Sequence, residues 1–258
     1  ENMTEKRTEI TVSDFEGKVK AFLSETSLLS SLSAPASRGE LPPPMEKSVP
    51  EEATVIRLPE PDMLPDLAVN FLETVELRTS VRVYGEEPVT QKELSALLWC
   101  TQGVKMALPG GKSIRNVPSA GGRHSFETYL LIQNVEGIKP GLYRFLAFAH
   151  ALLFVKDIEC AREKVIGSFP QRSLLEGSAV VFLWTSIAER SAFMFGARAL
   201  RYVFIDVGHV CQNLYLTAQA MKLGVSAIGA FSDEALNDAL GVDGVQEFSI
   251  YAAAVGRL

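Results

Sequence analysis

The chain has 258 residues, of which 47% are hydrophobic and 22% charged, a composition typical of a soluble globular protein with a sizeable core. Its 25 basic and 31 acidic residues give a formal net charge of −6. This charge argues against a nucleic-acid partner, because binding a phosphate backbone requires a dense basic face. No apolar run reaches the length of about 20 residues that crosses a bilayer, so we expect no association with a membrane.

Cysteines and histidines are few and widely spaced: Cys100, Cys160, Cys211, His124, His150 and His209. Their spacing fits neither a disulfide framework nor a metal site. We therefore expect reduced thiols, as in a cytoplasmic protein, and no bound metal. His209 lies within an apolar helical pattern, and we expect a packed histidine there rather than a catalytic base.

The first 62 residues differ in composition from the rest. Residues 27–62 are rich in Ser, Pro and Glu, and their prolines exclude a continuous helix or a central strand. We predict an N-terminal leader and a Pro-rich strap over residues 1–62, followed by one α+β domain over residues 63–258. The stretch "VSDFEGKVKAFL" is compatible with one short helix, and a disordered leader is the alternative.

Two arginines bracket a serine where one helical pattern ends and the next is about to begin. Apolar residues recur at helical spacing from Leu64 to Val75, which predicts a helix that leads into "RTSVR". Here Arg78, Ser80 and Arg82 lie two residues apart. Ion pairs with neighbouring glutamates would explain the arginines, and so would a bound anion.

A second helix is predicted to begin at Thr90, because "TQKE" is a capping box. Gly103 is expected to end it in the left-handed conformation. After a glycine-rich bend, strands are predicted over 126–134, 141–145, 151–156 and 178–187. The second and third are spaced as a hairpin, and the fourth is apolar enough to be covered on both faces.

The longest helical pattern runs from about Ala192 to Leu223 and would measure roughly 45 Å at 1.5 Å per residue. Such a length with a broad apolar face is typical of a helix at a subunit interface. A strand at "VSAIGAF" follows, then a short helix capped by Ser232 and ended by Gly241, then a final strand to Arg257.

Four stretches resemble the flavin-dependent nitroreductase superfamily, in particular its SagB-type dehydrogenase branch. They are "RTSVR" at 78–82, "PSAGGRHSFETYL" at 118–130, "AIGAF" at 227–231 and "VGR" at 255–257. The stretch "DVGHVCQNLYLTAQAMKLG" and the Pro-rich strap fit the same branch. The resemblance covers residues from about 60 to the end. It implies a nitroreductase-like fold, with a central mixed, mainly antiparallel sheet flanked by helices and a long helix at the dimer interface.

The resemblance also implies an FMN enzyme that works as a homodimer, with each flavin at the subunit interface and hydride passing on and off flavin N5. NADH or NADPH is the expected electron donor. The sequence has no G-x-G-x-x-G dinucleotide motif, as expected if the nicotinamide stacks on an open flavin face.

The family pattern assigns roles to several polar side chains. Arg78 and Ser80 are implied to bind the phosphate or the ribityl chain. Arg82 is implied to approach the pyrimidine end of the ring, where a cation favours the anionic reduced flavin. Gln171 is implied to face the pyrimidine edge, and Arg257 to be a second phosphate cation.

Two further stretches are implied to bring bare backbone to the ring. One comes from the partner subunit and covers the flavin: Pro118, Ser119 and Ala120. The other offers backbone amides to flavin N5 and O4: Ile228, Gly229 and Ala230. An ordinary Gly-rich loop and an ordinary strand-to-helix turn are the alternatives.

One departure from the branch bears on function. Relatives that oxidise azolines carry a Lys-Tyr pair before the long helix, where this chain has Met194 and Phe195, which cannot relay a proton. We therefore favour NAD(P)H-dependent reduction of a nitroaromatic, quinone or similar electrophile. A SagB-type dehydrogenase acting on a modified peptide or another small substrate is the first alternative, and a flavin-binding protein without turnover is the second.

Overall fold

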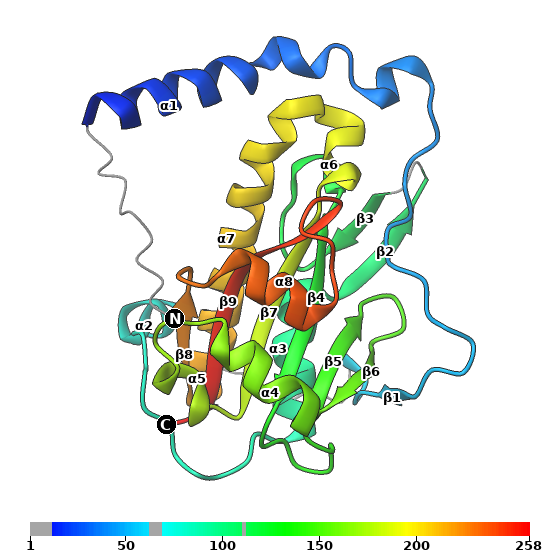
Figure 1. Ribbon diagram of the computed structural model, residues 1–258. Coiled ribbons are helices and arrows are strands. Elements are labelled where there is room, and N and C mark those ends of the chain that lie inside the picture. The colour runs from blue at the N-terminus through cyan, green and yellow to red at the C-terminus, as the bar shows by residue number, and fades with distance from the viewer. Residues whose placement is uncertain (1–11, 62–68, 110–111) are drawn as a thin grey trace.

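The computed structural model describes residues 12–61, 69–109 and 112–258. A seven-stranded sheet in the order β1-β6-β5-β4-β7-β9-β8 forms its centre, and β2 and β3 pair separately (Figure 1). The strands are β1 (Val55–Arg57), β2 (Val104–Leu108), β3 (Lys112–Arg115), β4 (Phe126–Ile132), β5 (Gly141–Leu146), β6 (Ala151–Asp157), β7 (Val180–Ile187), β8 (Leu223–Ile228) and β9 (Glu247–Arg257). All neighbouring pairs in the large sheet are antiparallel.

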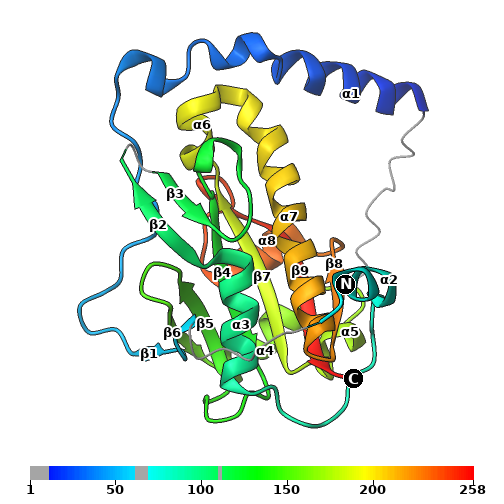
Figure 2. The ribbon, with the colours of Figure 1, turned by 180° about the vertical axis from the view of Figure 1, so that it is seen from behind.

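Helices cover both faces of the sheet. The α-helices are α1 (Val12–Glu25), α2 (Phe71–Leu77), α3 (Gln91–Gln102), α4 (Ile158–Gly167), α5 (Ser173–Glu176), α6 (Ala188–Phe195), α7 (Ala199–Ala220) and α8 (Asp233–Leu240). Short 3₁₀ turns are η1 (Leu28–Ser31), η2 (Pro35–Arg38), η4 (Ala120–Gly122) and η5 (Gly196–Arg198). Apolar side chains of α3 and α7 pack on one face, and those of α4, α5 and α8 pack on the other (Figure 2).

The predicted strands are confirmed, including the β5–β6 hairpin and the burial of β7 on both faces. Ser232 caps α8, and Gly241 ends it with a φ of 73°. The β2–β3 hairpin, the strand β1 inside the strap, and the helices α4 and α5 were not predicted from the sequence.

The expected helix over residues 192–223 is instead two helices. A bend at Gly196, with a φ of 52°, separates α6 from α7. A Cβ at this position would collide with the carbonyl oxygen of Ser30. Glycine is therefore required here for two reasons: the positive φ of the bend and the close approach of the strap. The remaining helix α7 has 22 residues, or about 33 Å at 1.5 Å per residue.

Both ends of α3 depend on local chemistry. The capping box is confirmed: Thr90 Oγ1 accepts from Glu93 N, and the Glu93 carboxylate accepts from Thr90 N at 2.8 Å. The prediction for Gly103 is wrong, because its φ of −56° is not left-handed. Gly103 is needed for close packing instead, since a Cβ there would collide with the Trp99 ring.

The helix before the arginine corner is only partly described, since residues 62–68 lie outside the described residues. Asn70 caps α2 by accepting from the amides of Leu72 and Glu73. The apolar side chains of α2 face solvent on the single chain: Phe71, Leu72, Val75 and Leu77.

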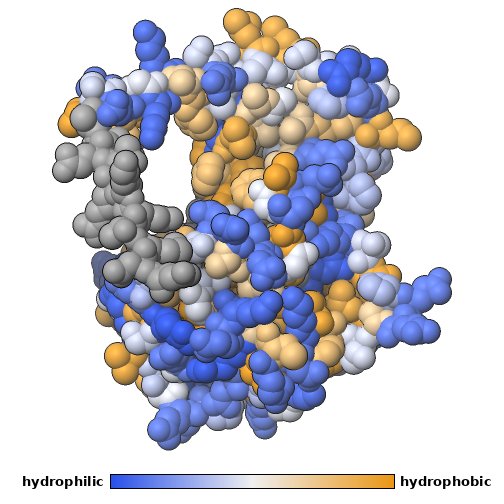
Figure 3. Space-filling view, in the orientation of Figure 1, coloured by the Kyte–Doolittle hydropathy of each residue, from blue (hydrophilic) through white to orange (hydrophobic). Residues whose placement is uncertain are grey.

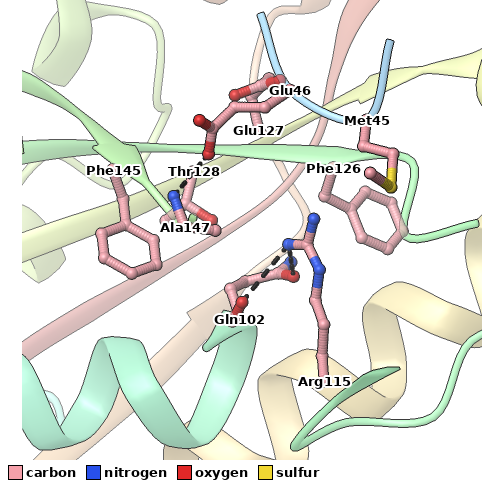
Figure 4. A pocket seen from close by; sticks show the side chains of 9 residues that line it. All are labelled: Met45, Glu46, Gln102, Arg115, Phe126, Glu127, Thr128, Phe145 and Ala147. Atoms are coloured by element: carbon pink, nitrogen blue, oxygen red, sulfur yellow. Dashed lines mark hydrogen bonds between the residues drawn. The ribbon is translucent and has the colours of Figure 1, made fainter. Parts of the chain in front are cut away.

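The strap follows the main domain and joins its sheet through β1, which pairs with β6. Its middle is fixed by buried charges on β4. Glu127 Oε1 accepts from Arg190 Nη2 at 2.6 Å and from the amide of Lys47 at 3.0 Å, and Arg190 Nε donates to Pro44 O at 2.9 Å. Figure 4 shows Glu46 beside this cluster, where its carboxylate accepts from the Ala147 amide. The expected boundary at residue 62 lies outside the described residues.

We predict that Glu127→Gln lowers the free energy of unfolding by about 3 kcal/mol, because it leaves Arg190 buried without its counter-charge. Urea denaturation followed by circular dichroism measures the change. Glu163→Gln is the control, since its pair with Arg172 is exposed and should leave the midpoint unchanged. Equal midpoints for both variants would show that the buried pair does not fix the strap.

Candidate active site

The predicted phosphate corner lies along the outer edge of β8. Ser80 forms a parallel bridge with Val225, and Val81 N donates to Val225 O at 2.8 Å. Gly224 permits this approach, because a Cβ there would lie 2.7 Å from the side chain of Val81. The corner therefore occupies a sheet edge whose backbone groups would otherwise be unpaired.

Tyr215 of α7 joins the corner to β8. Its hydroxyl accepts from the amide of Ala227 at 2.8 Å and lies 3.0 Å from Ser80 Oγ. The guanidinium of Arg78 lies over its ring, 5.2 Å from the centroid. Sequence reasoning missed Tyr215, because a tyrosine in an apolar helical pattern predicts only a core position.

The two arginines of the corner have no carboxylate partner among the described residues. Arg78 is half-buried, and Arg82 is exposed, where its Nη1 donates to Ser80 O at 3.4 Å. The alternative of ion pairs with nearby glutamates is not observed for any of Glu73, Glu76, Glu86 or Glu87. An uncommitted guanidinium retains the planar fork of donors that suits a phosphate.

The chain leaves the sheet directly after β8. Ile228 is buried at the strand end, whereas Gly229 and Ala230 are exposed. Neither amide of this exposed pair has a hydrogen-bond partner within the described residues. The ring of Tyr251 lies behind the turn, 3.6 Å from where a Cβ on Gly229 would be. The turn therefore presents bare backbone with available N–H donors.

The loop that contains Gln171 lies beside this turn. Ser168 O accepts from the amide of Ser232 at 2.8 Å, and the rings of Phe169 and Phe231 are 5.8 Å apart. Gln171 itself is exposed between α4 and α5. Its position is compatible with the predicted contact to the pyrimidine edge.

Arg257 is held by an acid in this structure. Its guanidinium donates to both oxygens of Glu93, at 2.8 and 2.9 Å, and to Pro88 O at 2.7 Å. Although burial acts to raise it, the hydrogen bonds from Arg257 and Thr90 lower the pKa of Glu93 below its ordinary value. A role for Arg257 at the phosphate stays a prediction, and Glu93 would compete with the phosphate for this guanidinium.

The "PSAGG" loop is fixed to α7 by one carboxylate. Asp206 accepts from Ser119 Oγ at 2.6 Å and from the amide of Ala120 at 3.1 Å. Burial raises the pKa of Asp206, and these two donors act in the opposite direction. Pro118 is exposed at the start of the loop.

The loop turns sharply before β4. Gly121, Gly122 and His124 all have positive φ values, of 60°, 64° and 43°. Burial and the charge of Arg115 lower the pKa of His124 to about 3, so its imidazole is neutral near pH 7. Its Nε2 lies 3.2 Å from the carbonyl oxygen of Ser113, so it is a packed part of the loop.

The two halves of the predicted flavin site lie on opposite sides of α7. Asp206, which holds the "PSAGG" loop, and Tyr215, which holds the arginine corner, are nine residues apart on one helix. At about 100° per residue they point in opposite directions, roughly 13 Å apart along the axis. Within one chain, the structure does not bring the loop and the corner together.

The two residues that replace the Lys-Tyr pair lie against the "PSAGG" loop. A Cβ on Gly121 would lie 3.2 Å from the sulfur of Met194 and 3.0 Å from the ring of Phe195. The space next to the predicted flavin cover is therefore apolar.

Other sequence expectations have mixed outcomes. The prediction of a packed histidine at 209 is wrong for the single chain, because His209 lies on the exposed face of α7. All three cysteines are free thiols. The described residues contain no cluster of side chains suited to a metal ion.

None of the described helices is both long and apolar enough to cross a bilayer.

Comparison with protein families covers most of the sheet and its helices but not the strap. The family model described as "Nitroreductase family" matches residues 75–257. The chain therefore belongs to the nitroreductase family. The match begins within α2, three residues before Arg78, and ends at Arg257.

Two relatives are informative. The chain is 32% identical over 195 residues to an inferred nitroreductase of Methanocaldococcus jannaschii, which covers 75% of this chain and 94% of the relative. It is 27% identical over 161 residues to the trifolitoxin-processing protein TfxB of Rhizobium leguminosarum bv. trifolii. That match covers 61% of this chain and 43% of TfxB, so the chain spans less than half of that relative.

Solved structures support the nitroreductase-like fold. An inferred nitroreductase from Ralstonia eutropha superposes with a TM-score of 0.63 at 25% identity, covering 85% of this chain and 95% of that one. An inferred nitroreductase from Desulfovibrio desulfuricans, solved in complex with FMN, gives a TM-score of 0.52 at 18% identity, covering 73% and 86%. The predicted fold class, α+β with a mainly antiparallel sheet between helices, is confirmed.

We predict that Asp206→Asn loosens the "PSAGG" loop, because a neutral amide oxygen accepts the hydrogen bonds from Ser119 and Ala120 more weakly than the charged carboxylate does. Replacing hydrogen bonds to a charged group by neutral ones costs about 1.5 kcal/mol, which corresponds to roughly tenfold faster amide exchange. Hydrogen–deuterium exchange over residues 118–124 measures it. Asp238→Asn, an exposed change on α8, should leave this segment unaffected. Unchanged exchange in the Asp206 variant would refute the assigned contact.

Proposed function

We propose that the chain is an FMN-dependent oxidoreductase that uses NADH or NADPH to reduce an electrophile such as a nitroaromatic or a quinone. Membership of the nitroreductase family supports the reaction class. Bound FMN supplies hydride chemistry at its ring, and the protein supplies binding, orientation and electrostatics. The observation that carries the proposal is the convergence, around Tyr215, of unpaired cations and free backbone amides at the end of β8.

The corner suits the phosphate end of FMN. A phosphomonoester has a charge near −2 at pH 7, and a half-buried guanidinium without a carboxylate partner is a favourable neighbour for it. Arg78 is half-buried and has no carboxylate partner among the described residues, and the ring of Tyr215 packs against its guanidinium and orients it. Ser80 adds a hydroxyl on the same side. Arg82 is free to approach the ring, where a cation stabilises negative charge.

The turn after β8 suits the reacting edge of the ring. The available amides of Gly229 and Ala230 would donate to ring nitrogen and oxygen atoms without an intervening side chain. Ile228 fixes the start of the turn by its burial, and Gln171 lies in the adjoining loop. We assign no general acid or base to any residue of this site.

The site is completed by a second copy of the chain. The side of α7 between Asp206 and Tyr215 is exposed, and it includes Phe204 and Ile205, which are 58% and 54% exposed. Gly208 lies on the same face with no atom near its missing Cβ. A mid-helix glycine lowers helix stability by about 1 kcal/mol, but it allows another backbone to approach closely. A homodimer through this face would bring the "PSAGG" loop of one copy to the corner of the other.

A peptide-tailoring dehydrogenase is the second candidate. The similarity to the trifolitoxin-processing protein favours it. The apolar pair Met194 and Phe195, next to Gly121, argues against azoline oxidation through the branch's Lys-Tyr pair. Reduction of an electrophile requires no such pair, and we therefore place it first.

We predict that the purified protein is yellow or becomes yellow with added FMN, and that anaerobic NADH or NADPH bleaches it. Arg78→Ala combined with Arg82→Ala should weaken FMN binding by about a hundredfold, because two cationic contacts to an anion are lost. Quenching of flavin fluorescence measures the dissociation constant.

Arg57→Ala combined with Lys139→Ala is the control, since both cationic side chains are exposed and lie at the β1–β6 end of the sheet, opposite β8. If the Arg78/Arg82 double variant binds FMN as tightly as the parent does, the assignment of the phosphate to this corner is wrong. A yellow protein that nicotinamide fails to bleach would favour the dehydrogenase or a binding protein without turnover.

We predict that Ile205→Glu converts the dimer to a monomer and removes FMN, because it places a charge in the proposed interface and separates the two halves of the site. Sedimentation velocity reports the mass, and absorbance reports the flavin. Val245→Glu changes an exposed apolar residue on a distant loop and should alter neither. A monomeric Ile205 variant that retains FMN would show that one chain suffices for binding.

A further inference from the structure

The helix α1 has an apolar stripe that the rest of the described residues leave largely uncovered. Five side chains at helical spacing form the stripe, all of them at least 38% exposed: Val12, Phe15, Val19, Phe22 and Leu23. No residue of α1 is buried. An amphipathic helix of this kind gains its stability mainly from packing its apolar face, and the described residues do not supply a surface for that packing.

Hydrogen bonds and a cation–ring contact join α1 to the body at the C-terminal end of the helix. Thr26, directly after α1, is buried, and its hydroxyl accepts from Arg201 Nε at 2.7 Å. Arg201 also donates to Leu23 O at 2.8 Å and lies over the ring of Phe22, and Arg198 donates to Thr26 O at 3.2 Å. These contacts fix the last turn of α1 to the first turn of α7. The helix extends about 21 Å, at 1.5 Å per residue, from this anchor.

The N-terminal part of α1 projects over the exposed side of α7 (Figures 1 and 2). Figures 1 and 2 both show α1 extending past the body at the N-terminal end of α7. Figure 3 shows an opening between α1 and the body, with apolar side chains along its inner wall. The exposed apolar residues of α7, including Phe204 and Ile205, belong to the side proposed above as the dimer interface.

A second uncovered apolar surface lies at the other end of α7. The helix α2 exposes Phe71, Leu72, Val75 and Leu77. Leu77 and Gln219 line one shallow pocket, so α2 lies beside the C-terminal end of α7. The part of the chain that the structure describes therefore has an uncovered apolar surface at each end of the same exposed helix.

We propose that α1 is a dimer arm whose apolar stripe packs on α2 of a second copy of the chain. This inference rests on the proposed dimer through α7. In a twofold dimer each contact occurs twice, and an antiparallel crossing of the two α7 helices places the N-terminal end of one beside the C-terminal end of the other. The arm of each copy then reaches the α2 helix of its partner. Both uncovered surfaces are buried by the same arrangement.

The arm connects the dimer to the flavin corner. Arg78 is the residue directly after α2, and its backbone amide donates to the carbonyl oxygen of Thr74 in this helix at 3.2 Å. An arm packed on Phe71 and Leu72 would hold α2 in place and hence fix the position of Arg78. The arm therefore acts as a positioning element for FMN in the partner rather than as a ligand of it.

The first test changes the stripe without touching the core. Phe15→Glu combined with Val19→Glu should raise the dimer dissociation constant at least tenfold by sedimentation equilibrium, and should weaken FMN binding at low protein concentration. Leu41→Glu combined with Val245→Glu changes two more exposed apolar residues outside α1 and α2 and should leave the dimer unchanged. If the parent is a dimer and the Phe15/Val19 variant has the same dimer dissociation constant, α1 is not a dimer arm.

The second test identifies what the arm touches. Two variants, each also bearing Cys160→Ser to remove the exposed native thiol, are mixed and oxidised: one has Phe15→Cys and the other has Leu72→Cys. A disulfide-linked pair that contains one chain of each variant supports the arm. Links between two Phe15→Cys chains, or none, overturn it. If the parent sediments as a monomer, the proposed dimer is wrong. If it is a dimer without the mixed disulfide, only the proposed position of α1 is wrong.

Discussion

The site depends on how the exposed edge of β8 is satisfied. An edge strand presents unpaired amide and carbonyl groups, and here residues 80–81 pair with it through Val81 N and Val225 O. That pairing puts Arg78 above Tyr215 and next to the turn at Gly229. The segment that covers the edge of β8 thus carries Arg78 and Arg82, and the turn after β8 supplies the available amides of Gly229 and Ala230. Without this backbone pairing, the cations and the amides would have no common location.

The helix α7 organises the rest. One side packs on the sheet, and two residues at the borders of the exposed side hold different loops: Asp206 holds "PSAGG", and Tyr215 holds the corner. The two candidate parts of the proposed flavin site therefore lie on opposite sides of this helix within one chain. The strap adds a further layer, since the buried pair Glu127–Arg190 fixes its middle and Arg201 fixes its start.

Much of the fold followed from local rules in the sequence. The Thr90 capping box, the β5–β6 hairpin and the fully buried β7 each depend on side chains within a few residues of one another. Errors arose where a distant segment decides the conformation. The expected long helix bends at Gly196 because Ser30 of the strap occupies the space of a side chain, and no local pattern contains that information.

The candidate site likewise contains some features set by residues close in sequence and others set by distant segments. The corner and the turn could be anticipated because short motifs encode them, and the structure places both at β8. Tyr215 could not, since its role depends on Ser80 and Ala227, which only the tertiary fold brings to it. The same holds for Glu93: its sequence position predicts only a helix cap, and the tertiary fold brings Arg257 to its carboxylate.

The contact between Ser30 and Gly196 has a kinetic consequence for the folding of this chain. It joins segments from the first and last quarters of the sequence, so forming it closes a very large loop, at an entropic cost that local contacts do not have. The sheet and its packed helices depend on nearer neighbours in the chain and are expected to assemble earlier. The strap would then pack onto a preformed bend as a late step of folding.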